Sequence, residues 1–257
     1  MAAGIVVSDV WEGMAGKKQD YRAKTAQDVE VTKILSIVAL IGIGICVAYL
    51  SYEDNLYSVG QFWMSPVLIM LIVNELGKYQ LFNLLFREDR TLNPRENVGL
   101  RKRKSFRSRI VDGIKFMGAM GMFLGIYAAI CIALGAPALE KHEETFTLAG
   151  VLTILTIFPL VIFLGISGCL QFLWTETLDS VSKVDAAYVK LAKISAAGAI
   201  FGAWSGSIVA PLDWDRRWQV YPIPNIVGAL LGYTLGDILV LCQQLISSIF
   251  PSFSLFP

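Results

Sequence analysis

Six long blocks of apolar residues, separated by short polar segments, constrain this chain more than any other feature. Each block can cross roughly 30 Å of hydrocarbon as a helix that rises about 1.5 Å per residue. Only 17% of the residues are charged, and a soluble domain of this length would not cluster its apolar residues in this way. The predicted membrane spans are residues 34–50, 62–86, 116–134, 146 to about 168, 189–210 and 225–250.

The chain is therefore predicted to be all-α, a polytopic membrane protein with six transmembrane helices. One membrane domain covers residues 34–250. A polar leader, 1–33, which is predicted to be cytosolic and partly disordered, precedes this domain, and a short tail, 251–257, follows it. The remaining polar segments are too short for a separate soluble catalytic domain.

The lysine and arginine residues predict the orientation of these spans. Eighteen of the 22 fall in the leader and in the connections that follow the second and fourth spans. Because such residues concentrate on the cytoplasmic side of membrane proteins, both termini are predicted to be cytosolic. The loop between the last two spans, residues 211–224, is then predicted to face the lumen or the exterior.

A basic run, Arg101, Lys102, Arg103 and Lys104, lies just before the third span on the predicted cytosolic side. We favour a role in fixing topology. Attraction of anionic headgroups, worth roughly 1 kcal/mol per basic residue, is the alternative. Nucleic-acid binding is not predicted, because the run has one aromatic neighbour and no recognisable binding fold around it.

Residues that bind metals or form disulfides are few and scattered. All four cysteines, Cys46, Cys131, Cys169 and Cys242, lie in apolar blocks, where they are predicted to pack as small side chains without disulfides. The single histidine, His142, stands alone in a short loop and is predicted to be solvated. The sequence therefore predicts no bound metal and no cofactor.

Glu75, Lys78 and Asp237 lie deep inside predicted spans, and each has a structural and a functional interpretation. Glu75 and Lys78 are three residues apart, so they share a helical face and can neutralise each other. Asp237 lies about twelve residues into the last span, roughly 18 Å below its end. We favour a structural pair and a hydrogen bond to another helix. A transport path, or the binding of a proton or polar headgroup, stays open.

Glycines recur every fourth residue in the last two predicted spans. Residues four apart drift only about 40° around a 3.6-residue helix, so each set forms one stripe. Such stripes allow two helix backbones to approach closely in a membrane. We predict that they pack against each other as a helical hairpin; reception of a partner protein's helix is the alternative. The stripes are Gly198, Gly202 and Gly206, and Gly228, Gly232 and Gly236.

The loop between these two stripes is rich in charged and aromatic residues. Its tryptophans suit the headgroup level of a bilayer, and its prolines fix a shaped backbone. Its acidic and arginine side chains could bind a zwitterionic headgroup, or form a salt-bridge cluster that clamps the hairpin. Without histidine or cysteine nearby, they are weak candidates for metal binding or acid–base catalysis. The candidate partner or headgroup contacts are Pro211, Leu212, Asp213, Trp214, Asp215, Arg216, Trp218, Gln219 and Pro222.

Residues 212–219 and 221–223 resemble the signature of the phosphatidylinositol-glycan biosynthesis class F family. Members of that family typically read P-L-D-W-D/E-R-P-W-Q, followed by an aromatic residue, proline and isoleucine. Shorter matches on both sides extend the resemblance to roughly residues 134–236. Arg217 stands where the family usually has proline, and Ala210 stands where a second proline often precedes the motif.

The resemblance implies residence in the endoplasmic reticulum membrane and a part in the assembly of glycosylphosphatidylinositol (GPI) anchors. The implied partner is a multi-span ethanolamine-phosphate transferase, which moves phosphoethanolamine from phosphatidylethanolamine onto mannose residues of the glycan. The family member itself is implied to be a non-catalytic, stabilising subunit and not an enzyme. The competing hypothesis is a protein that binds, delivers or translocates phosphatidylethanolamine.

Overall fold

The computed structural model describes residues 29–52, 55–62, 66–85, 106–137, 140–175, 183–209 and 216–249. The regular secondary structure of these residues is entirely helical. Several predicted features lie outside them: the leader up to residue 28, the basic run at 101–104, the motif residues Pro211 to Asp215, and the tail 251–257.

Each of the six apolar blocks forms a helix. These helices are Val29–Leu50, α2 (Val67–Leu85), α4 (Phe106–Ala133), α5 (His142–Thr175), α6 (Lys183–Gly206) and α7 (Ile223–Ile249). Within the part of the chain that the structure describes, four segments are long and apolar enough to cross a membrane: Val29–Leu50, Ile110–Ala133, His142–Thr175 and Ile223–Ile246. The protein is therefore an all-helical protein with candidate membrane spans.

The other two helices carry charge. In α2, Glu75 and Lys78 interrupt the apolar sequence. In α6, the charged residues concentrate in the first half, where Lys190 and Lys193 lie, whereas the second half is rich in alanine and glycine. Because charges lower the mean hydropathy of both helices, their place in a membrane depends on how the polar side chains are paired.

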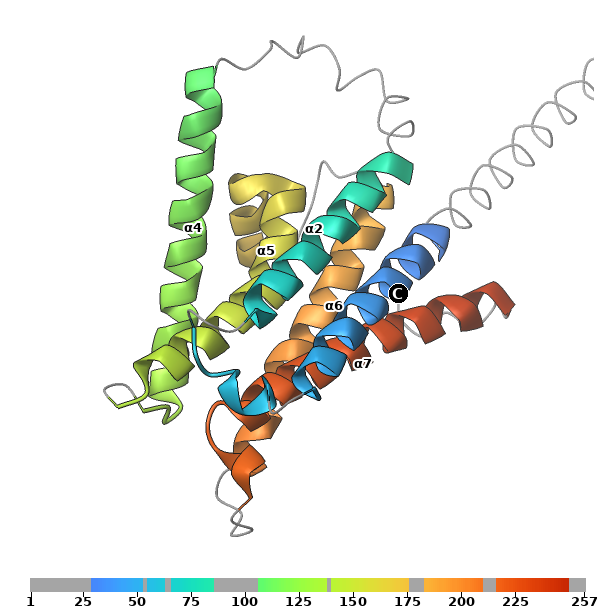
Figure 1. The fold of residues 1–257 in the computed structure, drawn as a ribbon. Helices are drawn as coiled ribbons and strands as arrows, with labels where there is room; N and C mark the ends of the chain where they lie inside the picture. Colours follow the sequence, from blue (N-terminus) through green and yellow to red (C-terminus); the bar gives the residue numbers. More distant parts are fainter. Residues whose placement is uncertain are drawn as a thin grey trace, which may run out of the picture.

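Helix α5 lies between α4 and α2 in Figure 1, where the first helix, α2 and α7 run obliquely and α4 stands nearly upright. Helix α5 packs against α2, α4, α6 and α7, and most of its apolar residues are buried. Helix α4 lies on the outer flank against α5, and few of its apolar residues are buried. The apolar face of α4 is thus left open to lipid or to another protein.

Five of the six helices are longer than the apolar blocks that predicted them, α4 and α5 by the most, and α2 is shorter. Helix α4 begins at Phe106, well before the predicted span at 116, and α5 continues to Thr175, beyond the predicted end near 168. Backbone hydrogen bonds are satisfied within a helix on both sides of a membrane surface, so a helix can continue into a polar sequence. The apolar residues therefore do not show where each helix begins and ends.

Helix α5 contains a sharp kink. Gly165 has φ 75° and ψ 171°, a combination accessible to glycine because it has no Cβ atom. Pro159, less than two turns earlier, lacks the backbone N–H that would complete the helical hydrogen bonding. The segment after the kink turns away from the rest of the helix (Figure 1).

Aromatic rings close the bundle at the end where α5 is kinked. The rings of Phe163 and Tyr188 stack with centroids 4.1 Å apart, and Phe82 meets them edge-on at 5.1 and 5.6 Å. Such pairs contribute about 0.5–1.5 kcal/mol beyond their buried area. They join α2, α5 and α6 where the glycine stripes do not reach.

Candidate functional site

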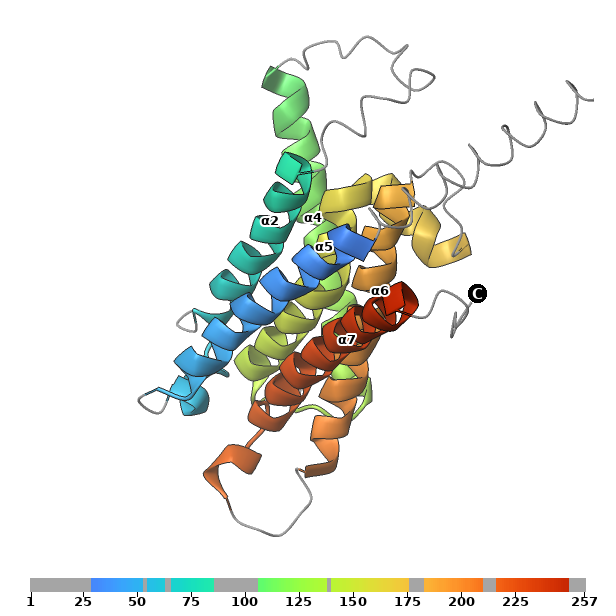
Figure 2. The ribbon, with the colours of Figure 1, turned by 90° about the vertical axis from the view of Figure 1, so that its right-hand side faces the viewer.

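The two glycine stripes lie face to face along α6 and α7, which run side by side in Figure 2. Gly202 lies against Gly228, and Gly198 lies against Gly232. A Cβ atom added to any of these four glycines would meet a backbone carbonyl of the opposite helix. Each stripe is therefore covered by the other, and neither is open to a partner's helix.

The ends of the stripes complete this contact. Gly206, at the end of α6, lies against the backbone of Pro224, and Gly236 lies against the backbone of Ser195. Close contact between the two backbones thus runs from the first turn of α7 to its middle. Contacts between backbones leave little room for adjustment, so we expect the pair to move as one unit.

An asparagine fastens the two helices where they meet the connecting loop. The side-chain amide of Asn225 donates hydrogen bonds to the carbonyl oxygen of Ala203 at 3.0 Å and to Ser207 Oγ at 2.7 Å. Both amide hydrogens of Asn225 are thereby used, and the side chain is buried. The first turn of α7 is fixed to the last turn of α6.

Gln219 closes the loop itself. Its side-chain oxygen accepts a hydrogen bond from the Arg216 backbone N–H at 2.9 Å, and its Nε2 atom donates to the carbonyl oxygen of Val209 at 3.3 Å. One side chain therefore joins the two sides of the motif. Among the predicted contact residues, Gln219 supports the loop, whereas Arg216 and Trp218 are exposed.

Arg217, which stands where the family usually has proline, has a partner in a different loop. Its guanidinium carbon lies 4.4 Å from the centre of the Tyr57 ring, a cation–π contact. Tyr57 belongs to the short helix Asn55–Ser58, which follows the first long helix. Arg217 therefore lacks the fixed backbone angle of a proline, but its side chain adds a contact between two loops.

Tyr221 and Pro222, at the end of the motif, extend this contact to a third loop. Buried Pro222 packs so closely on Gly60 that a Cβ atom there would lie 3.1 Å from the proline ring. Tyr221 donates a hydrogen bond to Thr145 Oγ1 at 3.1 Å. Burial raises the pKa of the Tyr221 hydroxyl to about 12, so it stays protonated and able to donate. Three loops therefore interlock at one end of the bundle, which we call the loop end: residues 55–62, 134–145 and 216–222.

The charged residues of α2 meet α7 inside the bundle. Lys78 Nζ lies 2.6 Å from Glu75 Oε1, and both side chains are at most 5% exposed. The Tyr233 hydroxyl donates to Glu75 Oε1 at 3.0 Å and accepts a hydrogen bond from Lys78. The structure thus brings the two charges together, with Tyr233 of α7 as their shared partner.

Asp237 lies one turn after Tyr233 and contacts α6. Ser195 Oγ donates to Asp237 Oδ1 at 2.5 Å, and both side chains are fully buried. In the part of the chain that the structure describes, Asp237 Oδ2 and Glu75 Oε2 have no hydrogen-bond partner. Helix α7 is therefore joined to α2 through Tyr233, and to α6 through Asp237 as well as Asn225.

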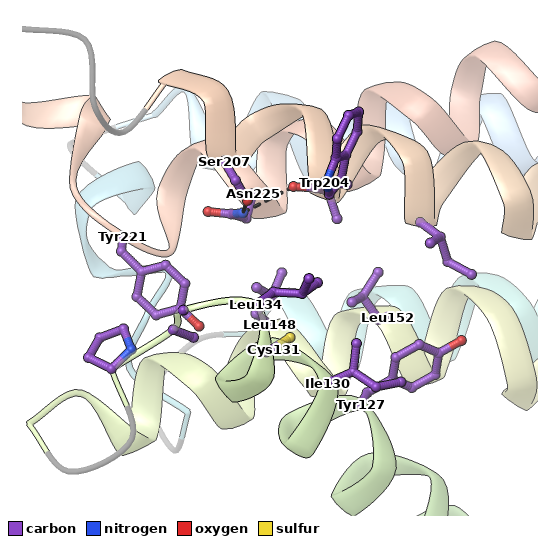
Figure 3. Close-up of a pocket in the computed structure, with 15 residues that line it drawn as sticks. Tyr127, Ile130, Cys131, Leu134, Leu148, Leu152, Trp204, Ser207, Tyr221 and Asn225 are labelled. Atoms are coloured by element: carbon purple, nitrogen blue, oxygen red, sulfur yellow. Dashed lines mark hydrogen bonds between the residues drawn. The ribbon is translucent and has the colours of Figure 1, made fainter.

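A pocket of about 430 Å³ lies beside the interlocked loops, between α4, α5 and α6 (Figure 3). Trp204, Ser207 and Asn225 line one side, and Leu134 lies across the gap from them. Tyr221 lies at the loop end of the pocket. Most of the lining is apolar, so the pocket suits a hydrocarbon ligand with a small polar part.

The cysteines and the histidine are scattered over the described helices, and Cys131 lines the pocket. Cys46, Cys131 and Cys169 are buried, Cys242 is exposed, and all four are free thiols. His142 is exposed at the start of α5. Among the described residues, no group of three His, Cys, Asp or Glu side chains is placed to bind a metal ion.

A family model described as "GPI biosynthesis protein family Pig-F" matches residues 27–241. The chain belongs to the PIG-F family. The match begins just before the first helix and ends in α7, so the PIG-F similarity covers far more than the region 134–236 that the motifs indicate.

Curated relatives agree with this PIG-F membership. A Mus musculus protein named "GPI ethanolamine phosphate transferase, stabilizing subunit" is 32% identical over 135 residues, which are 52% of this chain and 60% of the relative. A Pyricularia oryzae protein named "Glycosylphosphatidylinositol anchor biosynthesis protein 11" is 35% identical over 109 residues, 42% of this chain and 38% of the relative. A Schizosaccharomyces pombe "PIGF/3-ketodihydrosphingosine reductase fusion protein" is 35% identical over 125 residues, 47% and 24% of the two chains.

The matched regions span between about a quarter and three fifths of the length of these relatives. No solved structure is similar to this chain. The names of the PIG-F family and of these relatives therefore point to GPI biosynthesis.

Proposed function

We propose that this PIG-F family member is a non-catalytic, stabilising subunit of a GPI ethanolamine-phosphate transferase in the endoplasmic reticulum membrane. The family match over residues 27–241 carries this proposal. The name of the mouse relative, a stabilizing subunit of such a transferase, supports the accessory role. The partner would be a multi-span catalytic subunit that holds the transferase chemistry.

We further propose that all six helices cross the membrane, with both termini in the cytosol and the loop end in the lumen. The distribution of lysine and arginine supports this orientation. The buried pairing of Glu75 with Lys78 supports embedding of α2, because paired charges are far less costly in hydrocarbon than single ones. The alanine- and glycine-rich second half of α6, packed on α7, supports embedding of that helix.

The mechanism we propose is the rigid presentation of the motif loop. The glycine contacts hold α6 and α7 together, and Gln219 and Asn225 fix the base of the loop. Exposed Arg216 and Trp218 then project at the luminal surface, where the catalytic subunit would contact them. Arginine and tryptophan are enriched among the residues that contribute most to protein interfaces.

The competing hypothesis is a protein that moves phosphatidylethanolamine along a hydrated path lined by Glu75, Lys78 and Asp237. All three side chains are buried, and they pair with residues of neighbouring helices. This arrangement supports a structural role over a transport path. Binding of a lipid elsewhere on the protein is compatible with the accessory role.

The test is recovery of the catalytic subunit with a tagged form of this chain from gently solubilised membranes. An Asp213→Ala, Arg216→Ala double variant should reduce recovery at least fivefold, because it removes one carboxylate and one exposed guanidinium from the motif. Its melting temperature should stay close to that of the unchanged chain. Phosphoethanolamine transfer is measured in the same membranes.

Arg107→Ala is the matched control, because Arg107 is exposed at the start of α4, in the segment predicted to be cytosolic. This variant should leave recovery unchanged. Equal recovery for the double variant, the control and the unchanged chain would remove the motif from the subunit interface. If transfer failed while recovery stayed equal, the motif would act on lipid or glycan instead.

A further inference from the structure

A pocket of about 430 Å³ between α4, α5 and α6 lies beside the described part of the motif. We propose that it binds one acyl chain of a membrane phospholipid, with the glycerol and phosphate end of that lipid at Tyr221, Ser207 and Asn225. This inference rests on the proposed luminal orientation and extends the accessory role. The subunit would hold a phospholipid with its headgroup level with the motif.

The lining changes from polar to apolar along the pocket. At the loop end lie Ser207, Tyr221, whose hydroxyl donates to Thr145, and Asn225, whose amide hydrogens are donated to Ala203 and Ser207. Away from the loop end lie Ile130 and Leu152. A lipid has the same order of groups, with its glycerol oxygens nearest the surface and its hydrocarbon deeper.

The deeper part of the lining lies well below the loop end. Tyr127 is seven residues before Leu134, and Ile200 is seven residues before Ser207, which places each about 10 Å deeper at 1.5 Å per residue. The Tyr127 hydroxyl is hydrogen-bonded to Thr156 Oγ1 at 2.8 Å, so this hydroxyl does not need a polar partner on the ligand. The pocket thus follows the direction that acyl chains take in a bilayer.

The volume favours a lipid chain over a helix of another protein. A helix about 10 Å wide occupies on the order of 120 Å³ for each 1.5 Å of its length. A pocket of about 430 Å³ would therefore hold roughly one helical turn. A single acyl chain is much thinner and can fill the same space along its length.

The mouth of the pocket opens toward the hydrocarbon. Helix α4 packs on α5, and α5 packs on α6, so the opening lies between α4 and α6. Lining residues on both helices are exposed: Leu134 by 70%, Trp204 by 54% and Ile130 by 46%. A lipid can therefore enter sideways from the bilayer without crossing a polar region.

The experiment uses the full chain, purified into lipid nanodiscs without any transferase. The probe is phosphatidylethanolamine with a photoreactive diazirine on one acyl chain, and labelled peptides are found by mass spectrometry. Labelling should concentrate on residues 127–137, 148–152 and 200–207. The reference surface is the exposed face of α7 at Leu239, where labelling should be at least fivefold lower.

Ile130→Trp fills the pocket and should reduce its labelling at least fivefold. Ile132→Trp is the matched control: Ile132 lies on the same helix and is similarly exposed, at 43%, but does not line the pocket. Its labelling should stay within twofold of the unchanged chain. Equal labelling in the two variants would overturn the proposal, whatever the recovery of the transferase shows.

A fatty acid carrying the same diazirine tests the contribution of the headgroup. Phosphatidylethanolamine should label the pocket at least fivefold more than the fatty acid. Stronger labelling by the fatty acid would overturn the assignment to a phospholipid. Addition of the catalytic subunit should leave the lipid in place; displacement of the lipid, with crosslinks from the pocket to that subunit, would assign the pocket to a protein contact.

Discussion

Replacement of Lys78 by methionine should lower the free energy of unfolding by about 3–5 kcal/mol, because it leaves the buried Glu75 carboxylate without its cation. Tyr233 would remain as the donor to Glu75, and one neutral hydrogen bond does not offset a buried charge. The apparent melting temperature should fall by about 6–20 °C. Size-exclusion chromatography after heating in detergent measures this change.

Two further variants distinguish the loss of stability caused by breaking the buried pair from any loss caused by removing a lysine in general. Lys190→Met removes an exposed lysine of α6 and should change stability by less than about 0.5 kcal/mol. The double variant Glu75→Gln, Lys78→Met removes both charges and should recover at least half of the lost stability. Equal melting temperatures for Lys78→Met and Lys190→Met would contradict the structural role of the pair.

Replacement of Gly202 by alanine should destabilise the protein by about 3 kcal/mol or more, at the upper end of the usual cost of overpacking. The new methyl group would meet the carbonyl oxygen of Gly228, and neither backbone can move aside without separating α6 from α7. The motif loop would lose its fixed base as well. Recovery of the catalytic subunit should therefore fall together with the melting temperature.

The matched control makes the same substitution where there is room for it. Gly125 lies in α4, and a Cβ atom there would have no neighbour within 4 Å. Gly125→Ala should be neutral, or stabilise the helix by about 0.5–1 kcal/mol, because alanine loses less backbone entropy than glycine. Similar melting temperatures for the two alanine variants would contradict close packing of the glycine stripes.

The helices could be predicted from the sequence because each apolar block is a long, continuous stretch of residues. The same holds for the glycine stripes, since a spacing of four residues places three glycines on one helical face. The helix ends were less predictable: α4 begins at Phe106 and α5 bends at Gly165 without a change in apolarity at either residue. Apolar periodicity reports burial in lipid and carries little information about where a helix starts or kinks.

The partners of the polar residues could not be predicted, because they come from distant helices. The pairing of Glu75 with Lys78 follows from their spacing, but the contribution of Tyr233, 155 residues after Lys78, does not. A signal for Tyr233 was present, since it lies one turn before Asp237 on the same helix. Likewise, the motif does not reveal the hydrogen bonds by which Gln219 joins Arg216 to Val209.

The contact between α2 and α7 also sets an order of events during biosynthesis. At about 5–20 residues per second, the 155 residues from Lys78 to Tyr233 take roughly 8–30 s to translate. Throughout that interval, Glu75 and Lys78 lack the hydrogen bonds of the Tyr233 hydroxyl. In the proposed six-span arrangement, α2 therefore enters the bilayer provisionally and is secured when the final helix arrives. The last helix of the chain thus completes the polar contacts of the second.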